Sequence, residues 1–212
     1  MMTIKVFTFN PFQENTYILY DETKECIIID PGCQMNGEKR LLADFIRKNE
    51  LKLVHLINTH CHLDHVFGNA FVKETFDVPF SIHRGELPVL KAAVSVGAQY
   101  GVACEASPEP DSYIEDGDEI RFGNSVLKAI LTPGHSPASL SFYSEKARFV
   151  IAGDVLFLNS IGRTDLPGGD YKTLISSIME KLLPLGDDVV VYNGHGPSTS
   201  IGRERLSNPF LR

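Results

Sequence analysis

The sequence lacks the features that mark several classes of protein. Its four cysteines, at positions 26, 33, 61 and 104, show no CxxC or knuckle spacing, which argues against a disulfide framework or a structural zinc ribbon. No apolar stretch reaches the length of a membrane span, and the N-terminal residues show no charged segment followed by a long apolar one, as a secretory signal does. We therefore expect a cytoplasmic protein with reduced thiols and no membrane association.

Basic residues are also scarce relative to acidic ones. The chain has 20 Lys and Arg against 27 Asp and Glu, a formal net charge of −7, and no basic cluster that offsets it. This balance argues against a nucleic acid as partner, because phosphate backbones are bound by clustered positive charge. No serine stands in a GxSxG segment, so nothing indicates the serine nucleophile of that motif.

Length and composition predict a single domain. With 212 residues, of which 43% are hydrophobic, the chain can bury one sizeable core but is short for two ordinary domains. We take residues 1–212 as that domain, with 86–113 as a helical and loop insertion near the active site. This insertion either shapes substrate access or contributes an ordinary packing helix.

The heptapeptide THCHLDH, which ends at His65, is the most informative segment. It follows an apolar run and holds three imidazoles and a carboxylate, the usual protein ligands of zinc and non-haem iron. In an extended loop, His60, His62 and Asp64 would project to one side, with His65 where the chain can turn into a helix. So many donors exceed what one tetrahedral ion takes from a short segment. The spacing therefore predicts two ions, one on His60 and His62 and the other on Asp64 and His65.

Two residues near this run have plainer interpretations. Alternation places the side chain of Cys61 opposite to His60 and His62, which favours packing over a redox-sensitive role beside the site. His55 lies inside the preceding apolar strand, where a lone imidazole is more often a core residue than a metal ligand.

Three later segments repeat one format. Each is a short run rich in apolar and β-branched residues, followed by a glycine and then by a single residue of ligand type. These residues are His135, Asp154 and His195. If the strand ends converge at one edge of the packed sheets, the three side chains join the THCHLDH loop.

Hydrophobic periodicity gives a coarse order of elements. Strands are expected over 3–9, 15–20, 25–29 and 53–57, helices over 38–48, 86–100 and 170–183, and a loop over 103–112, with two to four strands after that loop and a last strand near 189–192. Pro88 is tolerated only in the first turn of its helix. The order suggests two sheets packed face to face with helices outside.

These residues together resemble the metallo-β-lactamase superfamily, from about residue 3 to residue 195. The resemblance rests on THCHLDH, the three later ligand-type residues and the early Asp30-Pro31-Gly32. The segments DHVFGN, which ends at Asn69, and GHSP, which ends at Pro137, are most similar to the glyoxalase II branch, the hydroxyacylglutathione hydrolases and their short bacterial relatives. The resemblance implies an α/β protein with the four-layer αβ/βα sandwich: two packed mixed β-sheets flanked by helices, with the metals at one edge.

The resemblance also implies a ligand set. It places His60, His62 and His135 on the first metal, Asp64, His65 and His195 on the second, and Asp154 between the two. Asp30 matches an early aspartate that orients the ligand loop without binding metal, although a turn-forming role is the alternative. The implied cofactors are two divalent metal ions, Zn²⁺ in the first place, with iron or manganese as alternatives.

The implied activity is that of a metal-dependent hydrolase. Its substrate would be a small acyl thioester such as hydroxyacylglutathione, attacked at the carbonyl by metal-bound hydroxide, with Asp64 as acceptor of the proton. Alternatives are a persulfide dioxygenase with a single iron held by two histidines and an aspartate, a hydrolase of lactones or other esters, and a non-catalytic metal-binding scaffold.

Two further residues are candidates for substrate contact. Arg163 belongs to Gly162-Arg163-Thr164-Asp165, which stands where glyoxalase II has a lysine-tyrosine contact to glutathione. It would either bind a substrate carboxylate through its guanidinium or pair with Asp165 to stiffen the loop. His83 ends another short apolar segment and would either line the pocket or serve a structural role.

Overall fold

The computed structural model describes residues 2–212, which form two compact units. The first unit runs to Ile114 and includes Arg121–Val126, and the second contains Glu115–Ile120 and Leu127–Arg212. The expectation of a single domain stays a prediction, and each unit is described by itself.

The first sheet has six strands in the order β1-β2-β3-β4-β5-β6. β1, β2 and β3 pair antiparallel, whereas β3, β4, β5 and β6 pair parallel, so the sheet is mixed. The strands are β1 (Thr3–Phe9), β2 (Glu14–Tyr20), β3 (Glu25–Ile29), β4 (Lys52–Ile57), β5 (Phe80–Ile82) and β6 (Ser112–Tyr113). The THCHLDH segment follows β4 directly, at the carboxyl end of an interior strand.

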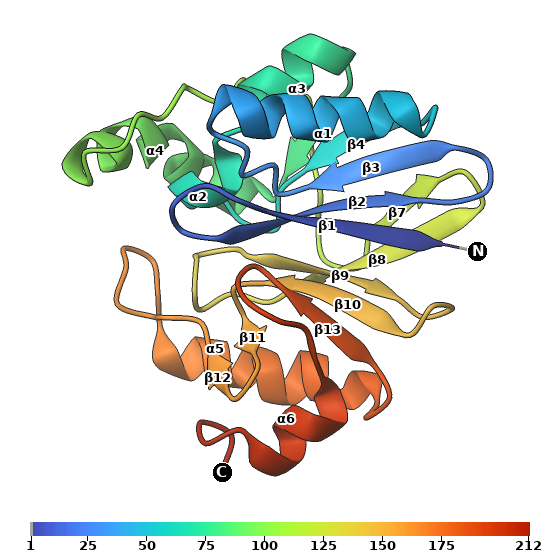
Figure 1. Ribbon diagram of the computed structural model, residues 1–212. Coiled ribbons are helices and arrows are strands. Elements are labelled where there is room, and N and C mark those ends of the chain that lie inside the picture. The colour runs from blue at the N-terminus through green and yellow to red at the C-terminus, as the bar shows by residue number, and fades with distance from the viewer. Residues whose placement is uncertain (1) are drawn as a thin grey trace. The chain divides into compact units, whose positions relative to one another are not determined.

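Burial explains the interior strands and the helix beside them. In β3, the three consecutive isoleucines Ile27–Ile29 are fully buried, as expected of β-branched residues in a strand covered on both faces. Helix α1 (Asn36–Lys48) buries Leu42, Ala43 and Ile46. Its first turn is closed by Glu38, whose carboxylate accepts from the backbone nitrogens of Gln34 and Met35. α1 and α3 (Asn69–Phe76) lie on one face of this sheet (Figure 1).

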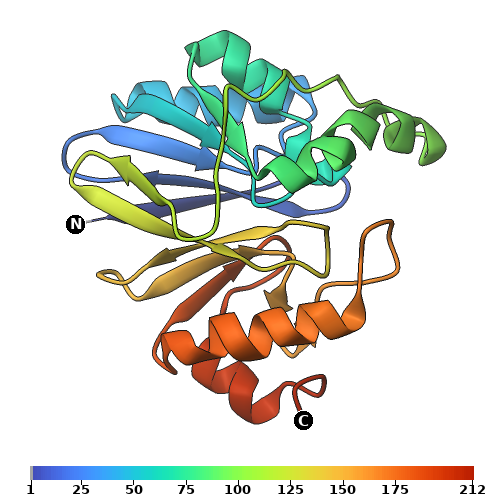
Figure 2. The ribbon, with the colours of Figure 1, turned by 180° about the vertical axis from the view of Figure 1, so that it is seen from behind.

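A helix lies in residues 86–113, where the sequence predicts one over 86–100; that these residues form an insertion stays a prediction. A 3₁₀ turn η1 (Arg84–Glu86) leads into α4 (Leu87–Gln99), with Pro88 in the first turn, where its missing N–H costs nothing. α4 packs against α2 (Leu63–Val66), which belongs to the ligand loop. Figure 2 shows α4 and the irregular segment that follows it in green. The insertion is therefore in contact with the THCHLDH segment inside the first unit.

The second sheet also has six strands, in the order β14-β13-β10-β9-β8-β7. β10 and β13 pair parallel, while the pairs β8–β9, β9–β10 and β13–β14 are antiparallel. The strands are β7 (Glu119–Phe122), β8 (Ser125–Leu131), β9 (Leu140–Ser144), β10 (Phe149–Gly153), β13 (Val190–Asn193) and β14 (Thr199–Ser200), and a separate hairpin joins β11 (Leu156–Phe157) to β12 (Ser160–Ile161). The central strand β10 is buried along its whole length.

Two helical segments lie on one face of the second sheet (Figures 1 and 2). They are α5 (Tyr171–Ser177) with its continuation, and α6 (Ile201–Ser207). The prediction of one helix over 170–183 is wrong beyond Ser177, because the chain continues as a π-helical segment, η2 (Ile178–Leu182), and a 3₁₀ turn, η3 (Leu183–Leu185). Pro184 cannot donate the hydrogen bond that an α-helix needs there, so regular geometry ends before it.

None of the helices among residues 2–212 has the length and apolar character that a membrane crossing requires.

Candidate metal centre

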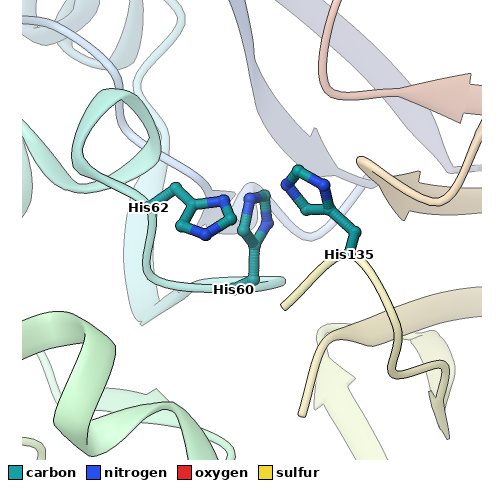
Figure 3. Close-up of side chains that lie close together, drawn as sticks. All are labelled: His60, His62 and His135. Atoms are coloured by element: carbon teal, nitrogen blue, oxygen red, sulfur yellow. The ribbon is translucent and has the colours of Figure 1, made fainter. Parts of the chain in front are cut away.

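The ligand loop departs from the extended form expected for it. The chain is extended up to His62, which has φ −62° and ψ 152°, and then enters the single helical turn α2. Asp64 and His65 therefore project from a helix, and the alternation argument holds only for His60 and His62. The two rings of His60 and His62 meet edge to face with their centroids 4.8 Å apart, and the His60 and His65 centroids are 4.1 Å apart. Figure 3 draws His60 and His62 on this loop and His135 on the loop that follows β8.

Asp30 contacts His65 directly and His60 through the Thr59 hydroxyl. Its Oδ2 atom lies 3.1 Å from Nδ1 of His65, and it also accepts from the Thr59 hydroxyl at 2.6 Å. The same hydroxyl lies 3.0 Å from Nδ1 of His60. Because the Thr59 hydrogen points to the carboxylate, the Thr59 oxygen accepts the Nδ1 hydrogen of His60. Both imidazoles are thereby held in the tautomer that presents Nε2, as metal-binding histidines usually are.

The backbone at Asp30 adopts the conformation that this support requires. Its φ is 51°, in the left-handed region that aspartate tolerates better than most residues. The carboxylate also accepts from the backbone nitrogen of Thr59 at 2.7 Å. Asp30 is therefore a turn residue and a support for the ligand loop at once. The two roles proposed for it from sequence are compatible.

In the second unit, Asp154 lies between two histidines. Its Oδ2 atom is 3.5 Å from Nε2 of His135 and 3.4 Å from Nε2 of His195. Nδ1 of His135 lies 2.8 Å from the carbonyl oxygen of Arg163, which can only accept, so His135 also presents Nε2. Each of the three residues follows a strand end, after β8, β10 and β13 respectively. One carboxylate oxygen is therefore almost equidistant from two imidazole nitrogens.

Gly162 allows the β12 segment to approach these residues. A Cβ atom at this position would lie 1.9 Å from the carbonyl oxygen of Asp154 and 3.2 Å from Cβ of His135. Only glycine fits so close to another backbone. The approach brings the Arg163 carbonyl within reach of His135.

The side chain of Arg163 forms an exposed ion pair. Its Nε and Nη2 atoms lie 2.7 and 2.6 Å from the two carboxylate oxygens of Asp165. Hydrogen bonding to Arg163 lowers the pKa of Asp165 to about 2. The pairing with Asp165 is thus the role that the geometry supplies, and substrate contact through Arg163 stays a proposal.

The remaining sequence candidates lie in structural positions. Nδ1 of His83 accepts from the backbone nitrogen of Gly85 at 3.0 Å and so caps η1. Nε2 of His55 lies 2.8 Å from the Ser81 hydroxyl, and burial lowers its pKa. Cys61 is fully buried in the apolar core of the first unit, where burial raises the pKa of its thiol. The packing interpretations of His55 and Cys61 agree with these contacts.

Two buried acids near the ligand loop were not found from sequence. Glu86 accepts from the backbone nitrogen of Cys61 at 3.0 Å, between two candidate ligands. Glu14 is fully buried, with one oxygen 4.0 Å from Nδ1 of His65, and burial raises its pKa well above the usual value. An acid at the start of a strand or helix carries no sequence signal of such a role. Their burial in the structure is what points to these roles, because a buried carboxylate requires a hydrogen-bond or charge partner.

Comparison with known proteins identifies the family. A family model of the metallo-β-lactamase superfamily matches residues 9–195. The chain belongs to the metallo-β-lactamase superfamily. The expected fold is confirmed: the protein has the metallo-β-lactamase fold, with two mixed sheets flanked by helices. Members of this superfamily bind divalent metal ions, and the residues described above supply the nitrogen and oxygen donors such ions need.

Three relatives in sequence show the range of this superfamily. The probable metallo-hydrolase YqgX of Bacillus subtilis is 40% identical over 95% of this chain and 93% of its own. The hydroxyacylglutathione hydrolase GloC of Haemophilus influenzae is 36% identical over 99% and 98%. The human mitochondrial persulfide dioxygenase ETHE1 is 32% identical over 92% of this chain and 70% of its own.

Two solved structures are similar over nearly the whole chain. The B3 metallo-β-lactamase BLEG-1 has a TM-score of 0.90 at 36% identity and covers 99% of both chains. TTHA1623 in a di-iron-bound form has a TM-score of 0.88 at 35% identity, covering 98% of this chain and 100% of that one. This chain is therefore a metallo-β-lactamase superfamily member of the hydrolase type.

Proposed function

We propose that this protein hydrolyses acyl thioesters of the hydroxyacylglutathione kind with a pair of divalent metal ions. The observation that carries the proposal is the position of Asp154, whose Oδ2 atom is almost equidistant from Nε2 of His135 and Nε2 of His195, at 3.5 and 3.4 Å. Because the two histidines are assigned to different ions, a carboxylate at similar distances from both would let Asp154 contribute to the binding of each. The proposed ions are Zn²⁺, with iron and manganese as alternatives.

The proposed ligand set follows the resemblance, and the hydrogen bonds support it. The first ion would take His60, His62 and His135, the second Asp64, His65 and His195, with Asp154 shared. His60, His65 and His135 each have Nδ1 held by an oxygen, from Thr59, Asp30 and Arg163 respectively. Fixed Nδ1 atoms leave Nε2 as the ligand atom and orient the ring, which strengthens metal binding.

The chemistry divides between the ions and the protein. When bound, such ions supply a water whose pKa is near neutral and polarise the carbonyl that it attacks. The protein holds the ligands in place and accepts the proton of that water at Asp64, whose side chain is 13% exposed beside His65. A thiolate leaves at moderate pKa, so little acid catalysis from the protein is needed. No protein nucleophile is required.

The coverage of the sequence relatives favours a thioester over a persulfide as substrate. The hydroxyacylglutathione hydrolase of Haemophilus influenzae aligns over nearly its full length, whereas the human persulfide dioxygenase aligns over 70% of its own. We further propose a cytoplasmic location and a small-molecule substrate with no nucleic acid or membrane partner. Arg163 could meet a substrate carboxylate only by exchanging its pairing with Asp165.

Persulfide oxidation is the second candidate. It is favoured by the 32% identity to the human persulfide dioxygenase over 92% of this chain, and the alternative drawn from the sequence gives it a single iron. The activity assays should also include lactones and other esters as substrates. A β-lactam should be assayed as well, because the similar structure BLEG-1 is a metallo-β-lactamase.

Metal analysis of the purified protein, paired with activity assays, separates these functions. We expect about two metal ions per chain. We also expect hydrolysis of S-lactoylglutathione, measured as a decrease in the absorbance of its thioester. Asp154→Asn should lose metal and activity together, while Asp44→Asn, at an i,i+4 pair with Lys48 on α1, serves as the matched control. One iron per chain, together with oxygen uptake when glutathione persulfide is added, would favour persulfide oxidation over thioester hydrolysis. Metal bound with no turnover of any substrate would indicate a binding scaffold.

A further inference from the structure

The two ligand residues of α2 are held by their backbone carbonyls. A single helical turn leaves its carbonyl groups without partners inside the helix. α2 ends at Val66 and α3 begins only at Asn69, and between them the backbone nitrogen of Gly68 donates to the carbonyl of Pro31 at 2.7 Å. Amide side chains from other segments bind instead. Nδ2 of Asn10 lies 3.0 Å from the carbonyl oxygen of Asp64, and Nδ2 of Asn58 lies 3.0 Å from that of His65.

Asn58 is in turn oriented by Asn69, the last residue of the DHVFGN segment. Nδ2 of Asn69 donates to Oδ1 of Asn58 at 2.9 Å and lies 3.2 Å from the hydroxyl oxygen of Ser107. An amide nitrogen carries two hydrogens, so Asn69 can serve both acceptors. Asn58 and Asn69 are buried, at 1% and 0% exposure. Three successive hydrogen bonds therefore join Ser107 to the backbone of His65.

Ser107 belongs to a segment that is anchored on both sides. The carbonyl of Ala103 accepts from the side chain of Gln34 at 2.7 Å. The backbone nitrogen of Asp111 donates to Phe80, and its carboxylate accepts from the Phe80 nitrogen at 2.7 Å. Because its flanks are fixed, Ser107 offers its oxygen to Asn69 at a defined place. Asn58 and Asn69 are buried and Ser107 is half-buried, and hydrogen bonds among such side chains restrict one another's geometry.

We infer that Ser107, Asn69 and Asn58 are positioning residues for His65, so that the 101–111 segment of the insertion sets the affinity of the metal ion bound by Asp64 and His65. The inference rests on the proposed two-metal centre. It gives the end of the DHVFGN segment a role: Asn69 transmits the position of the insertion to the ligand turn. A network that only stabilised the fold would leave metal affinity unchanged once the protein is folded.

Ser107→Ala tests the inference, with Ser95→Ala as its matched control. Ser95 lies exposed on α4 in the same insertion, and its hydroxyl donates only within the helix, to the Ala92 carbonyl at 2.8 Å. The metal-free full chain is titrated with Co²⁺ and followed by its visible absorption, which reports each binding step. Ser107→Ala should weaken one of two steps by about three- to tenfold and leave the other unchanged, as loss of one hydrogen bond behind a ligand does. Ser95→Ala should match the parent chain.

Two further variants complete the test. Ser107→Thr keeps the hydroxyl and should restore parent affinity, whereas Asn69→Asp removes both N–H donors at constant size and should weaken the same step by about tenfold or more. Thermal unfolding of the metal-free chains should be equal for Ser107→Ala and Ser95→Ala. Equal Co²⁺ affinities for these two variants, or equal weakening of both steps, would overturn the inference. A parent chain that binds no Co²⁺ would overturn the proposed function itself.

Discussion

The tautomers of three histidines are fixed by oxygen atoms outside the proposed ligand set. For His60 this atom is the Thr59 hydroxyl, which also donates to Asp30. Thr59→Val has nearly the same shape but lacks the hydroxyl, so the His60 ring loses its orientation. We expect metal affinity to fall about 10- to 100-fold, as for other outer partners of metal ligands. Chelator competition measures it, with Thr59→Ser as the variant that should retain affinity.

Asp64 is the residue on which the proposed proton transfer depends. Asp64→Asn keeps the size of the side chain but removes its basicity. We expect turnover to fall by at least about tenfold while the first ion is retained, since general base contributions are of this size or larger. Steady-state kinetics with metal analysis of the same sample tests it, and unchanged turnover would exclude Asp64 from the mechanism.

For single residues, the sequence predicted which side chains are candidate metal ligands better than it predicted the residues that contact them. Three imidazoles in a hexapeptide indicate metal binding whatever the fold, because few other arrangements explain them. Glu14 and Glu86 were missed because their roles depend on partners 51 and 25 positions away in the chain, His65 and Cys61. Such contacts arise only from tertiary packing.

Gly162, which follows the β11–β12 hairpin, allows the chain to pass close to the backbone of Asp154. At Gly162 a methyl group would meet the Asp154 backbone at 1.9 Å, so Gly162→Ala must displace the segment that holds His135. We expect loss of bound metal and destabilisation of about 2 kcal/mol or more, in the range of overpacking. Gly37→Ala is the control, because nothing lies within 4 Å of a Cβ there and alanine favours the helix. Equal metal content in the two variants would contradict the argument.

Hydrogen bonds to Asp21 join the turn between β2 and β3 to the turn between β7 and β8. The Asp21 carboxylate accepts from the backbone and hydroxyl of Thr23, from the backbone of Asn124 and from the Ser125 hydroxyl. Although burial alone would raise its pKa, these hydrogen bonds lower it to about 2. A pKa lower in the folded than in the unfolded chain stabilises the protein above about pH 4, and this stabilisation fades as pH falls toward 2.

Asp21→Asn should therefore cost about 2 kcal/mol at pH 7, since each pKa unit is worth about 1.4 kcal/mol. The difference from the parent chain should shrink by about half at pH 3. Urea denaturation from pH 6 to pH 3 measures it. Asp165→Asn removes a carboxylate of similar pKa at an exposed site and should change stability little. A difference that stays constant with pH would count against the role of Asp21.

Elements were predicted where burial and periodicity agree. The isoleucine run of β3 and the amphipathic α1 follow from their patterns, and both lie where the sequence placed them. A turn into a helix was expected at His65, whereas α2 already begins at Leu63, because four residues show no period that would place its start. The π-helical end of α5 was missed because its apolar spacing fits an α-helix equally well. Short or irregular helices are set by packing and by neighbouring proline, which the pattern does not report.

At the scale of the whole molecule, the proposed ligands come from segments far apart in the sequence, from His60 to His195. Ions that bind such a set stabilise only the folded chain, by about 2.7 kcal/mol each at a hundred times the dissociation constant. We expect an apparent Tm about 5 to 10 °C higher per ion, since 1 kcal/mol shifts a chain of this size by about 2 to 4 °C. Calorimetry with and without Zn²⁺ measures it, and Asp154→Asn should show a smaller rise. Identical melting of the parent chain in both conditions would contradict the ligand set.

The overall fold was predicted from motifs rather than from periodicity. Five separated motifs identified the superfamily, whereas strand and helix patterns alone allowed several arrangements of two sheets. The division into two compact units was not predicted, because length and composition do not report how contacts cluster.

The burial of Cys61 has a consequence for metal selection. Its sulfur lies in the apolar core while the residues on both sides are histidines. A cation on the proposed ligands would therefore meet imidazole nitrogen and carboxylate oxygen from this loop but not the Cys61 thiolate, the kind of donor that selects soft ions such as cuprous copper. A loop that turned this sulfur outward would favour those soft ions over the borderline cations that the imidazoles suit.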